Sequence, residues 1–181
     1  RQNTFATDRT SSVFYERGAT VGCHHLNSTL TNMSPANGKR PIVDVTRSES
    51  ISTSHRLHSK LLGDEENSRI FGKCNNPNGH GHNYKVDVTV RGPVDEVTGM
   101  VINVADLKVI IQKVVMNVFD HKNVDLDVPV FRDTNLVSTA ENIAVVIYDD
   151  IQELLPEGVK LYRVRLHETG KNVVDYYGIR E

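Results

Sequence analysis

The chain has 181 residues, a formal net charge of −2 and a pI near 6.5. This length suits one domain with a proper hydrophobic core and is short for two. The nearly balanced charge argues against a nucleic-acid partner, and no apolar run approaches the roughly 18 residues of a membrane span, so no membrane partner is expected. Only two cysteines, Cys23 and Cys74, are present. They favour a reducing compartment, so the expected location is cytoplasmic.

Residues 1–40 are rich in Ser, Thr and Asn and show no sustained apolar period. Such a segment buries too little surface to offset the entropy lost on ordering, so it is predicted to be a disordered N-terminal extension. Its Ser/Thr richness also resembles a mitochondrial transit peptide, although Asp8 and Glu16 argue against that interpretation. The predicted folded domain covers residues 41–181.

Two long strands are predicted in the first half of this domain. Residues 42–55 show a strand-like alternation at their odd positions, with a bulge expected around 47–49. Residues 80–91 form the clearest strand, because their even positions are apolar and their odd positions polar. Between the strands, residues 64–67 are a charged loop or short helix. Residues 100–102 are predicted to be a brief extended return.

Two helices and a hairpin are predicted to follow. Apolar residues recur at helical spacing over 103–119, and after a loop over 120–135 the sequence Ser-Thr-Ala-Glu at 138–141 fits a capping box that begins the second helix. Pro156 and Gly158 end that helix. Residues 161–177 read as a closing hairpin. The order ββααββ predicts an α+β fold, with a four-stranded antiparallel sheet and two helices on one face.

His80 and His82 are the first candidates for a metal site. Alternate strand residues point the same way, so these two imidazoles project from one face with their Cα atoms about 7 Å apart. Gly79 and Gly81 remove bulk beside them, as a close approach to a ligand requires. Neutral imidazoles suit zinc better than calcium or magnesium. The alternative is a pair of hydrogen-bonded, half-buried histidines.

A catalytic zinc usually has a third protein ligand and an open position. His55 is the best candidate, because it ends the first strand on the face of Ile51, and His58 is the reserve choice. The Cys-His-His sequence at 23–25 also contains metal-binding residues, but it lies in a segment with no evident scaffold. Cys74 as a fourth ligand would instead give a structural Cys-His-His-His site.

Cys74 has a second interpretation, as a nucleophile or general base. Its thiol must then lose a proton near neutral pH, which requires a basic neighbour. Asp120 and His121 could supply one, with the carboxylate orienting the imidazole that activates the thiol. An Asp-His pair near a helix end is also consistent with a capping or dipole interaction.

Glu168 is unusual because strand alternation aims its carboxylate at the apolar face. Such a carboxylate needs a partner, and a planar ligand with adjacent N–H donors would satisfy both oxygens. Alternatively the strand has already ended and Glu168 lies in solvent. Glu141 is explained by the predicted capping box alone.

Several motifs in the same order resemble the 6-pyruvoyltetrahydropterin synthase family. They cover residues 52–57, 71–84, 120–125, 138–142 and 167–169, whereas residues 1–40 lie outside the resemblance. The resemblance implies the T-fold, in which three subunits join their sheets into a barrel. It also implies that two trimers stack into a hexamer, with active sites at subunit interfaces.

The resemblance also implies roles for individual residues. Zn2+ would be held by His55, His80 and His82. Catalysis would be carried out by Cys74, Asp120 and His121. The pterin would be bound by Glu168 as its anchor, with Thr139 and Glu141.

The implied reaction is a carbon–oxygen lyase step in tetrahydrobiopterin biosynthesis. It converts 7,8-dihydroneopterin triphosphate to 6-pyruvoyltetrahydropterin and releases triphosphate, with Mg2+ as a partner of the phosphates. One alternative is a 6-carboxytetrahydropterin synthase-like enzyme, whose cysteine lies closer to the His-Gly-His segment than Cys74 does. A non-catalytic zinc-stabilised module and a pterin-binding regulator are the remaining alternatives.

Overall fold

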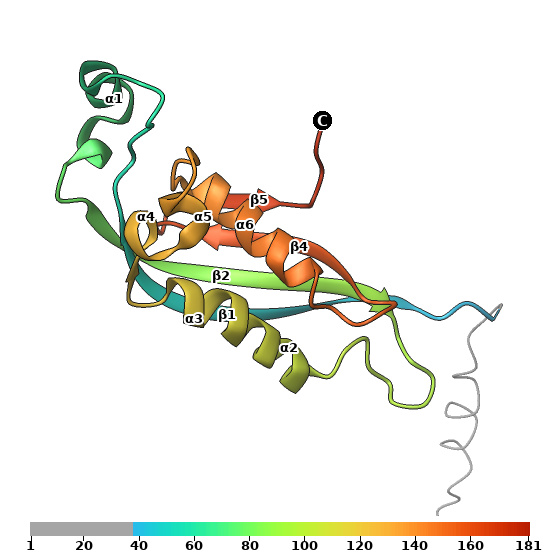
Figure 1. Cartoon of the computed structure of the whole chain (residues 1–181). Coiled ribbons are helices and arrows are strands. Elements are labelled where there is room, and N and C mark those ends of the chain that lie inside the picture. Colours follow the sequence, from blue (N-terminus) through green and yellow to red (C-terminus); the bar gives the residue numbers. More distant parts are fainter. Residues whose placement is uncertain (1–37) are drawn as a thin grey trace, which may run out of the picture. The chain divides into compact units, whose positions relative to one another are not determined.

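The computed structural model describes residues 38–181, of which Lys39–Glu181 form one compact unit (Figure 1). The N-terminal extension predicted over residues 1–40 falls outside the described residues, except for its last three positions, 38–40. Within residues 38–181, no helix combines the length and apolarity that a membrane crossing requires.

Five strands form a single sheet in the order β3-β1-β2-β4-β5. Their bounds are β1 (Ile42–His55), β2 (His80–Pro93), β3 (Lys122–Asn123), β4 (Lys160–His167) and β5 (Val173–Tyr176). Antiparallel pairing joins β1, β2, β4 and β5, which confirms the four predicted strands. The fifth, β3, adds a two-residue parallel pairing to β1. A strand of two residues has no alternation to detect, so the sequence does not predict it.

The longest pairing joins β1 to β2 without interruption, from Ile42 opposite Pro93 to His55 opposite His80. The bulge predicted around 47–49 is therefore wrong. Arg47 and Glu49 interrupt the apolar pattern without a bulge. Their side chains form a half-buried ion pair with a nitrogen–oxygen distance of 2.6 Å. Residues 100–102, predicted as an extended return, belong to no strand of the described structure.

Most of the helical segments lie on one face of the sheet (Figure 1). They are α1 (Asp64–Phe71), η2 (Gly72–Asn75), α2 (Val104–Ile111), η3 (Gln112–Met116), α3 (Asn117–Phe119), α4 (Val124–Asp127), α5 (Pro129–Arg132) and α6 (Ala140–Gln152), of which α1 and η2 lie apart from the sheet. The predicted helix over 103–119 is α2, η3 and α3 in succession, with π-type turns in η3. The predicted loop over 120–135 instead contains the short helices α4 and α5.

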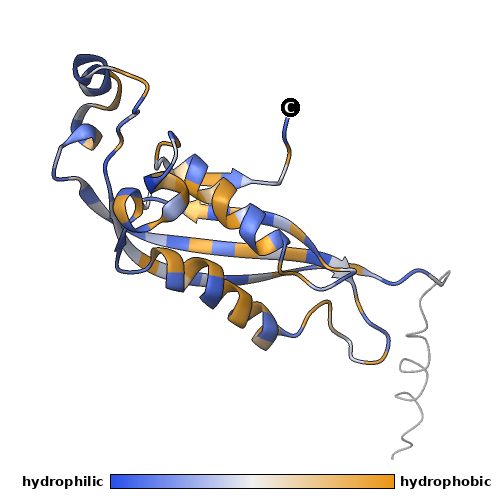
Figure 2. Cartoon of the chain, viewed as in Figure 1, coloured by the Kyte–Doolittle hydropathy of each residue, from blue (hydrophilic) through white to orange (hydrophobic). Residues whose placement is uncertain are grey.

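The core lies between the sheet and the two long helical stretches. The side chains at the even positions from Tyr84 to Val90 of β2 are fully buried in one core with residues of α2, η3 and α6, and Figure 2 shows the resulting alternation along β2. The largest buried apolar side chains are Tyr84, Phe119, Phe131, Ile51, Leu107, Ile111, Ile143, Ile147, Ile151 and Leu166. The apolar faces predicted from strand and helix periodicity are thus the faces that pack together.

The capping residue of α6 is Thr139, whose Oγ1 accepts a hydrogen bond from the Asn142 N–H at 3.3 Å. The predicted capping box over 138–141 is therefore displaced by one residue. Glu141 occupies the second helical position and does not complete the box. Its side chain is free for another role.

The opposite face of the sheet is polar and has its own hydrogen-bond network. Asp87, on this face, is nearly buried and accepts hydrogen bonds from Ser48 Oγ at 2.5 Å and His167 Nε2 at 2.9 Å. The Lys85 ammonium lies 3.1 Å from the same carboxylate. These partners satisfy a carboxylate that burial alone would destabilise.

The charge of Asp87 should make stability depend on pH. Burial alone would raise the pKa of Asp87, but hydrogen bonds from Ser48, His167 and Lys85 outweigh it and lower the pKa to about 2. A lowered pKa stabilises the fold above the unfolded value near 4, and this stability is lost as pH falls toward 2. Asp87→Asn should therefore lower the free energy of unfolding by up to about 2 kcal/mol at pH 6 and by little at pH 2.

Urea unfolding followed between pH 2 and 7 measures this difference. Asp133→Asn is the control, because Asp133 is exposed and, among residues 38–181, its carboxylate pairs with the adjacent Arg132 alone. If the free energy of unfolding of Asp87→Asn differs from that of the unmodified chain by the same amount at every pH, the charge of Asp87 does not stabilise the fold.

Candidate active site

Three histidines converge at one end of the β1–β2 pair. The register sets His55 opposite His80 and Thr53 opposite His82, so all three imidazoles project from the helix-covered face. Their ligand nitrogens all lie within 4.8 Å of one another. The Nε2 atoms of His55 and His80 are 3.2 Å apart. The sequence prediction of these three side chains as one group is confirmed in position.

The histidine cluster fits a tetrahedral zinc ion. Nitrogens about 2.0–2.1 Å from a tetrahedral zinc ion would be separated by roughly 3.3 Å, close to the 3.2 Å between the Nε2 atoms of His55 and His80. The His55 Nδ1 atom lies 2.7 Å from the Ser138 carbonyl oxygen, so Nδ1 donates a proton and Nε2 keeps its lone pair. The His82 Nε2 atom is buried without a hydrogen-bond partner. Burial lowers the pKa values of His55 and His82, which favours the neutral, metal-binding form.

Two other candidate ligands lie apart from this cluster. The reserve ligand His58 accepts a hydrogen bond at Nδ1 from the Asn75 side chain at 3.1 Å, and it is not part of the group. Cys74 lies in η2, half-buried, and is also outside the group. A four-ligand site that includes Cys74 is therefore not formed. The predicted alternative at residues 23–25 lies outside the described residues.

Asp120 and His121 form the predicted carboxylate–imidazole pair. The Asp120 Oδ2 atom lies 2.9 Å from His121 Nδ1, while Oδ1 accepts the Ser52 N–H at 2.8 Å. The His121 N–H in turn donates to the Ser52 carbonyl at 2.7 Å. Both residues are thus bonded to the edge of β1, while Asp120 also holds the C-cap position of α3, where its N–H donates to the Met116 carbonyl at 3.1 Å.

His121 has an unusual backbone and an open side chain. Among residues 38–181 it is the one non-glycine residue with a positive φ, 57°, and its side chain is 83% exposed. Such strain often marks functional positions. No hydrogen bond joins Cys74 to His121 in the described part of the chain, so one copy brings together two members of the predicted triad and not the third.

The three predicted substrate residues line one pocket of about 500 Å3. Glu168 follows the last residue of β4, Thr139 caps α6, and Glu141 lies in the first turn of α6. Glu168 accepts only a long contact of 3.4 Å from the Asn172 amide, so its carboxylate keeps capacity for a ligand. The strand has ended before Glu168, as one interpretation expected, yet the residue faces this pocket and is half-buried.

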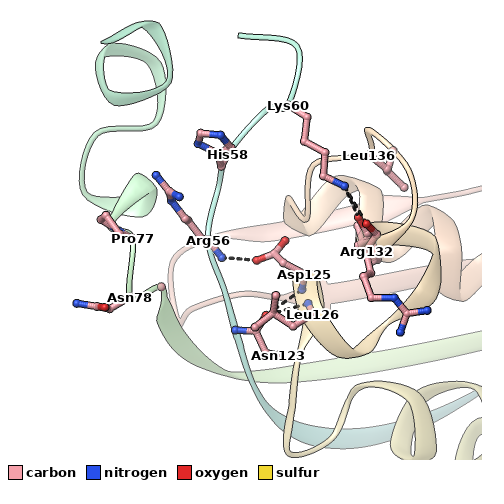
Figure 3. A pocket seen from close by; sticks show the side chains of 12 residues that line it. Arg56, His58, Lys60, Pro77, Asn78, Asn123, Asp125, Leu126, Arg132 and Leu136 are labelled. Carbon is pink, nitrogen blue, oxygen red and sulfur yellow. Dashed lines mark hydrogen bonds between the residues drawn. The ribbon is translucent and has the colours of Figure 1, made fainter. Parts of the chain in front are cut away.

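A second pocket, of about 430 Å3, is lined by Arg56 and Gly79, the chain neighbours of His55 and His80 (Figure 3). Its lining includes the cationic side chains of Arg56, Lys60 and Arg132, with Asp125 among them. The Asp125 carboxylate accepts the Arg56 N–H at 2.6 Å. Sequence reasoning missed these residues, although Arg56 follows His55 and Asp125 belongs to the motif over 120–125. Arg132 is paired with Asp133, so Arg56 and Lys60 are the cations that make the lining favourable for an anion.

Gly79 permits the close contact between the two histidine-bearing strands. Its φ is +71°, and a Cβ there would lie 2.8 Å from the His55 carbonyl oxygen. Gly79→Ala should displace His55 or His80 and weaken zinc affinity by roughly tenfold or more, as changes around metal ligands do. Competition with a chromophoric chelator measures the affinity.

Gly99→Ala is the matched control, because Gly99 has nearly the same φ, +69°, and no atom within 4 Å of its added Cβ. Both variants carry the backbone strain, and only Gly79→Ala adds the contact. Equal zinc affinity in the two variants would show that the contact does not position the histidines.

Comparison with known proteins agrees with this geometry. The sequence profile of the family 6-pyruvoyl tetrahydropterin synthase matches residues 44–179. The 6-pyruvoyl tetrahydrobiopterin synthase of Homo sapiens is 57% identical over 141 residues, which covers 78% of this chain and 95% of that protein. The Drosophila melanogaster protein of the same name is 51% identical over 140 residues, covering 77% and 82%.

A solved structure gives the same result. The 6-pyruvoyl tetrahydropterin synthase of Caenorhabditis elegans superposes with a TM-score of 0.74 at 44% identity, covering 78% of this chain and 99% of that one. The predicted T-fold is thereby confirmed. The chain belongs to the 6-pyruvoyl tetrahydropterin synthase family.

Proposed function

We propose that this protein is a zinc-dependent lyase that converts 7,8-dihydroneopterin triphosphate to 6-pyruvoyltetrahydropterin and triphosphate, in the cytoplasm. The observation that carries the proposal is the convergence of His55, His80 and His82, at one end of the β1–β2 pair. A pocket lined by Glu168 supports a pterin substrate, and the cationic pocket beside Arg56 suits its triphosphate, together with Mg2+.

The three histidines would hold the zinc ion, and three protein ligands leave a fourth tetrahedral position for a further ligand. Bound zinc would act as a Lewis acid that polarises hydroxyl groups on the pterin side chain and acidifies the adjacent C–H bonds. The hydrogen bond from His55 Nδ1 to the Ser138 carbonyl keeps that imidazole in the required tautomer.

Glu168 would anchor the pterin ring. Its two carboxylate oxygens can accept hydrogen bonds from adjacent ring N–H donors, which fixes the ring so that its side chain reaches the histidines. Thr139 and Glu141 line the same pocket. Because Thr139 Oγ1 caps α6 as an acceptor, its hydroxyl proton stays available for a ligand.

Cys74 and the Asp120–His121 pair would transfer protons. The thiolate removes a proton from a side-chain carbon, and the imidazole, held at Nδ1 by Asp120, moves a proton at Nε2. We propose that the pair of one subunit completes the site of another, in a trimeric barrel that stacks into a hexamer. The 83% exposure of the His121 side chain at the β1 edge supports this arrangement.

The alternatives have less support. Cys74 precedes His80 by six positions, which is longer than expected for a 6-carboxytetrahydropterin synthase. A zinc-stabilised module with Cys74 as a ligand disagrees with its position outside the histidine group. A regulator that only binds pterin would not need the Asp120–His121 pair.

Cys74→Ala tests the central claim. The variant should keep its fold and one zinc per chain, because Cys74 is no ligand, and should lose triphosphate release by at least about a hundredfold, as general bases do. Metal analysis and turnover of 7,8-dihydroneopterin triphosphate measure the two effects. Cys23→Ala, which removes the other thiol, should change neither. Loss of zinc in Cys74→Ala would contradict the catalytic role.

Glu168→Gln tests the pterin anchor. The amide replaces one acceptor oxygen with a donor, so KM should rise roughly tenfold to a hundredfold while zinc content stays unchanged. Steady-state kinetics and metal analysis measure both. Glu157→Gln, at an exposed position after α6, is the control. An unchanged KM for Glu168→Gln would remove the anchor from the proposal.

A further inference from the structure

Asn75 is a buried residue on η2, the turn that carries Cys74. This turn and the segment 56–58, which follows His55, belong to no strand, so the sheet does not hold them together. Asn75 is only 8% exposed, whereas asparagine usually lies at the surface. A buried amide needs hydrogen-bond partners, and among the described residues those of the Asn75 amide all lie in the segment 56–58.

The Asn75 amide contacts three consecutive residues of that segment. Its Nδ2 atom lies 2.7 Å from the Leu57 carbonyl oxygen and 3.1 Å from His58 Nδ1. Its Oδ1 atom lies 3.3 Å from a guanidinium nitrogen of Arg56. Because a carbonyl only accepts and a guanidinium only donates, these contacts fix which end of the amide is which. Both amide protons and the amide oxygen are therefore used within the protein.

Leu57 links this amide to the candidate active site. The Leu57 N–H donates to the Cys74 carbonyl at 2.8 Å, so its main chain is bonded to Cys74 on one side and to Asn75 on the other. The Leu57 side chain lines the same pocket as Glu168. Leu57 also follows the candidate zinc ligand His55 by two residues. The position of the turn that carries the thiol, relative to the pocket and the histidines, thus depends on its contacts with Leu57.

We propose that Asn75 is the positioning residue for Cys74, because its amide holds the turn of the thiol against Leu57, beside the pterin pocket. This inference rests on the proposed function, in which Cys74 removes a proton from the substrate. Proton removal requires close approach of the two groups, and a displacement of about 1 Å can lower the rate about a hundredfold. Asn75 acts through Cys74 and is not itself a catalytic residue.

Asn75→Asp removes both N–H donors while it keeps the shape of the side chain and an acceptor for Arg56. For 7,8-dihydroneopterin triphosphate, kcat should fall roughly tenfold to a hundredfold, whereas KM and zinc content should stay unchanged, since Glu168 and the histidines remain in place. Asn75→Ala, which adds no charge, should give the same result. The bonds from the Leu57 N–H to the Cys74 carbonyl and from Arg56 Nε to the Asn75 carbonyl, at 2.8 and 2.9 Å, should keep the turn attached.

Alkylation of Cys74 measures the position of the thiol without any substrate. In a Cys23→Ala background Cys74 is the sole cysteine, and its rate of reaction with iodoacetamide depends on the exposure of the thiol. Cys74 is half-buried, so release of the turn in Asn75→Ala should raise this rate several-fold.

Asn67 supplies the matched controls, Asn67→Asp and Asn67→Ala. It is a second buried asparagine, 0% exposed, whose amide bonds to main-chain groups of Ser59, Leu62 and Gly63 at 2.7–3.1 Å. Within residues 38–181 its amide makes no hydrogen bond to η2 or to the segment 56–58. The Asn67 variants should lose at least as much thermal stability as the Asn75 variants, yet keep kcat and the alkylation rate of Cys74.

The outcomes separate this inference from the proposed function. Equal loss of kcat in the Asn67 and Asn75 variants would indicate general loosening and overturn the positioning role. An unchanged kcat or alkylation rate in the Asn75 variants, or a rise in KM alone, would overturn it as well. If the unmodified chain does not turn over the triphosphate, the proposed function fails. The alkylation rates then still decide whether Asn75 positions the thiol: a rise confined to Asn75→Ala supports it, and no rise overturns it.

Discussion

The pairing of β1 with β2 is the constraint on which the remaining structure depends. Each strand has 14 residues, and the register is unbroken from Ile42–Pro93 to His55–His80. It sets the apolar positions of β2 under the helices and His55 across from His80. A slip of one residue would turn every side chain of one strand to the opposite face. The core and the histidine cluster would then be lost together, so both depend on the same strand register.

The same strand organises the second half of the chemistry. On the edge of β1 away from β2, just before the short pairing with β3, the Ser52 N–H donates to Asp120 Oδ1 and the Ser52 carbonyl accepts the His121 N–H. The two functional groups are therefore anchored to one strand, the histidine cluster on its covered face and the exposed pair on its edge. An edge is where a neighbouring copy can reach, and a covered face is where it cannot.

Strand alternation predicted most of this arrangement, because it is local. It placed His80 and His82 on one face and His55 on the matching face of the other strand. Features that depend on contacts across the chain were not predictable. The bond from His55 to the Ser138 carbonyl spans 83 positions, and nothing in either segment indicates it. The helix start was shifted from Ser138 to Thr139 because adjacent hydroxyl residues cap equally well. Elements of two to four residues, such as β3 and α4, have no period to recognise.

The Ser138 carbonyl has a consequence that reaches beyond the tautomer of His55. It immediately precedes the cap of α6, so the imidazole joins the start of the main helix to the end of the sheet. Suppose that a ligand binds more tightly when α6 is packed on the sheet than when the helix is loosened. The difference between the two binding free energies is then the amount by which the ligand stabilises the packed helix. On the proposed function, metal occupancy and the attachment of α6 would be two sides of one equilibrium. A chelator would then act on the position of the helix, and a mutation in its first turn would act on metal affinity.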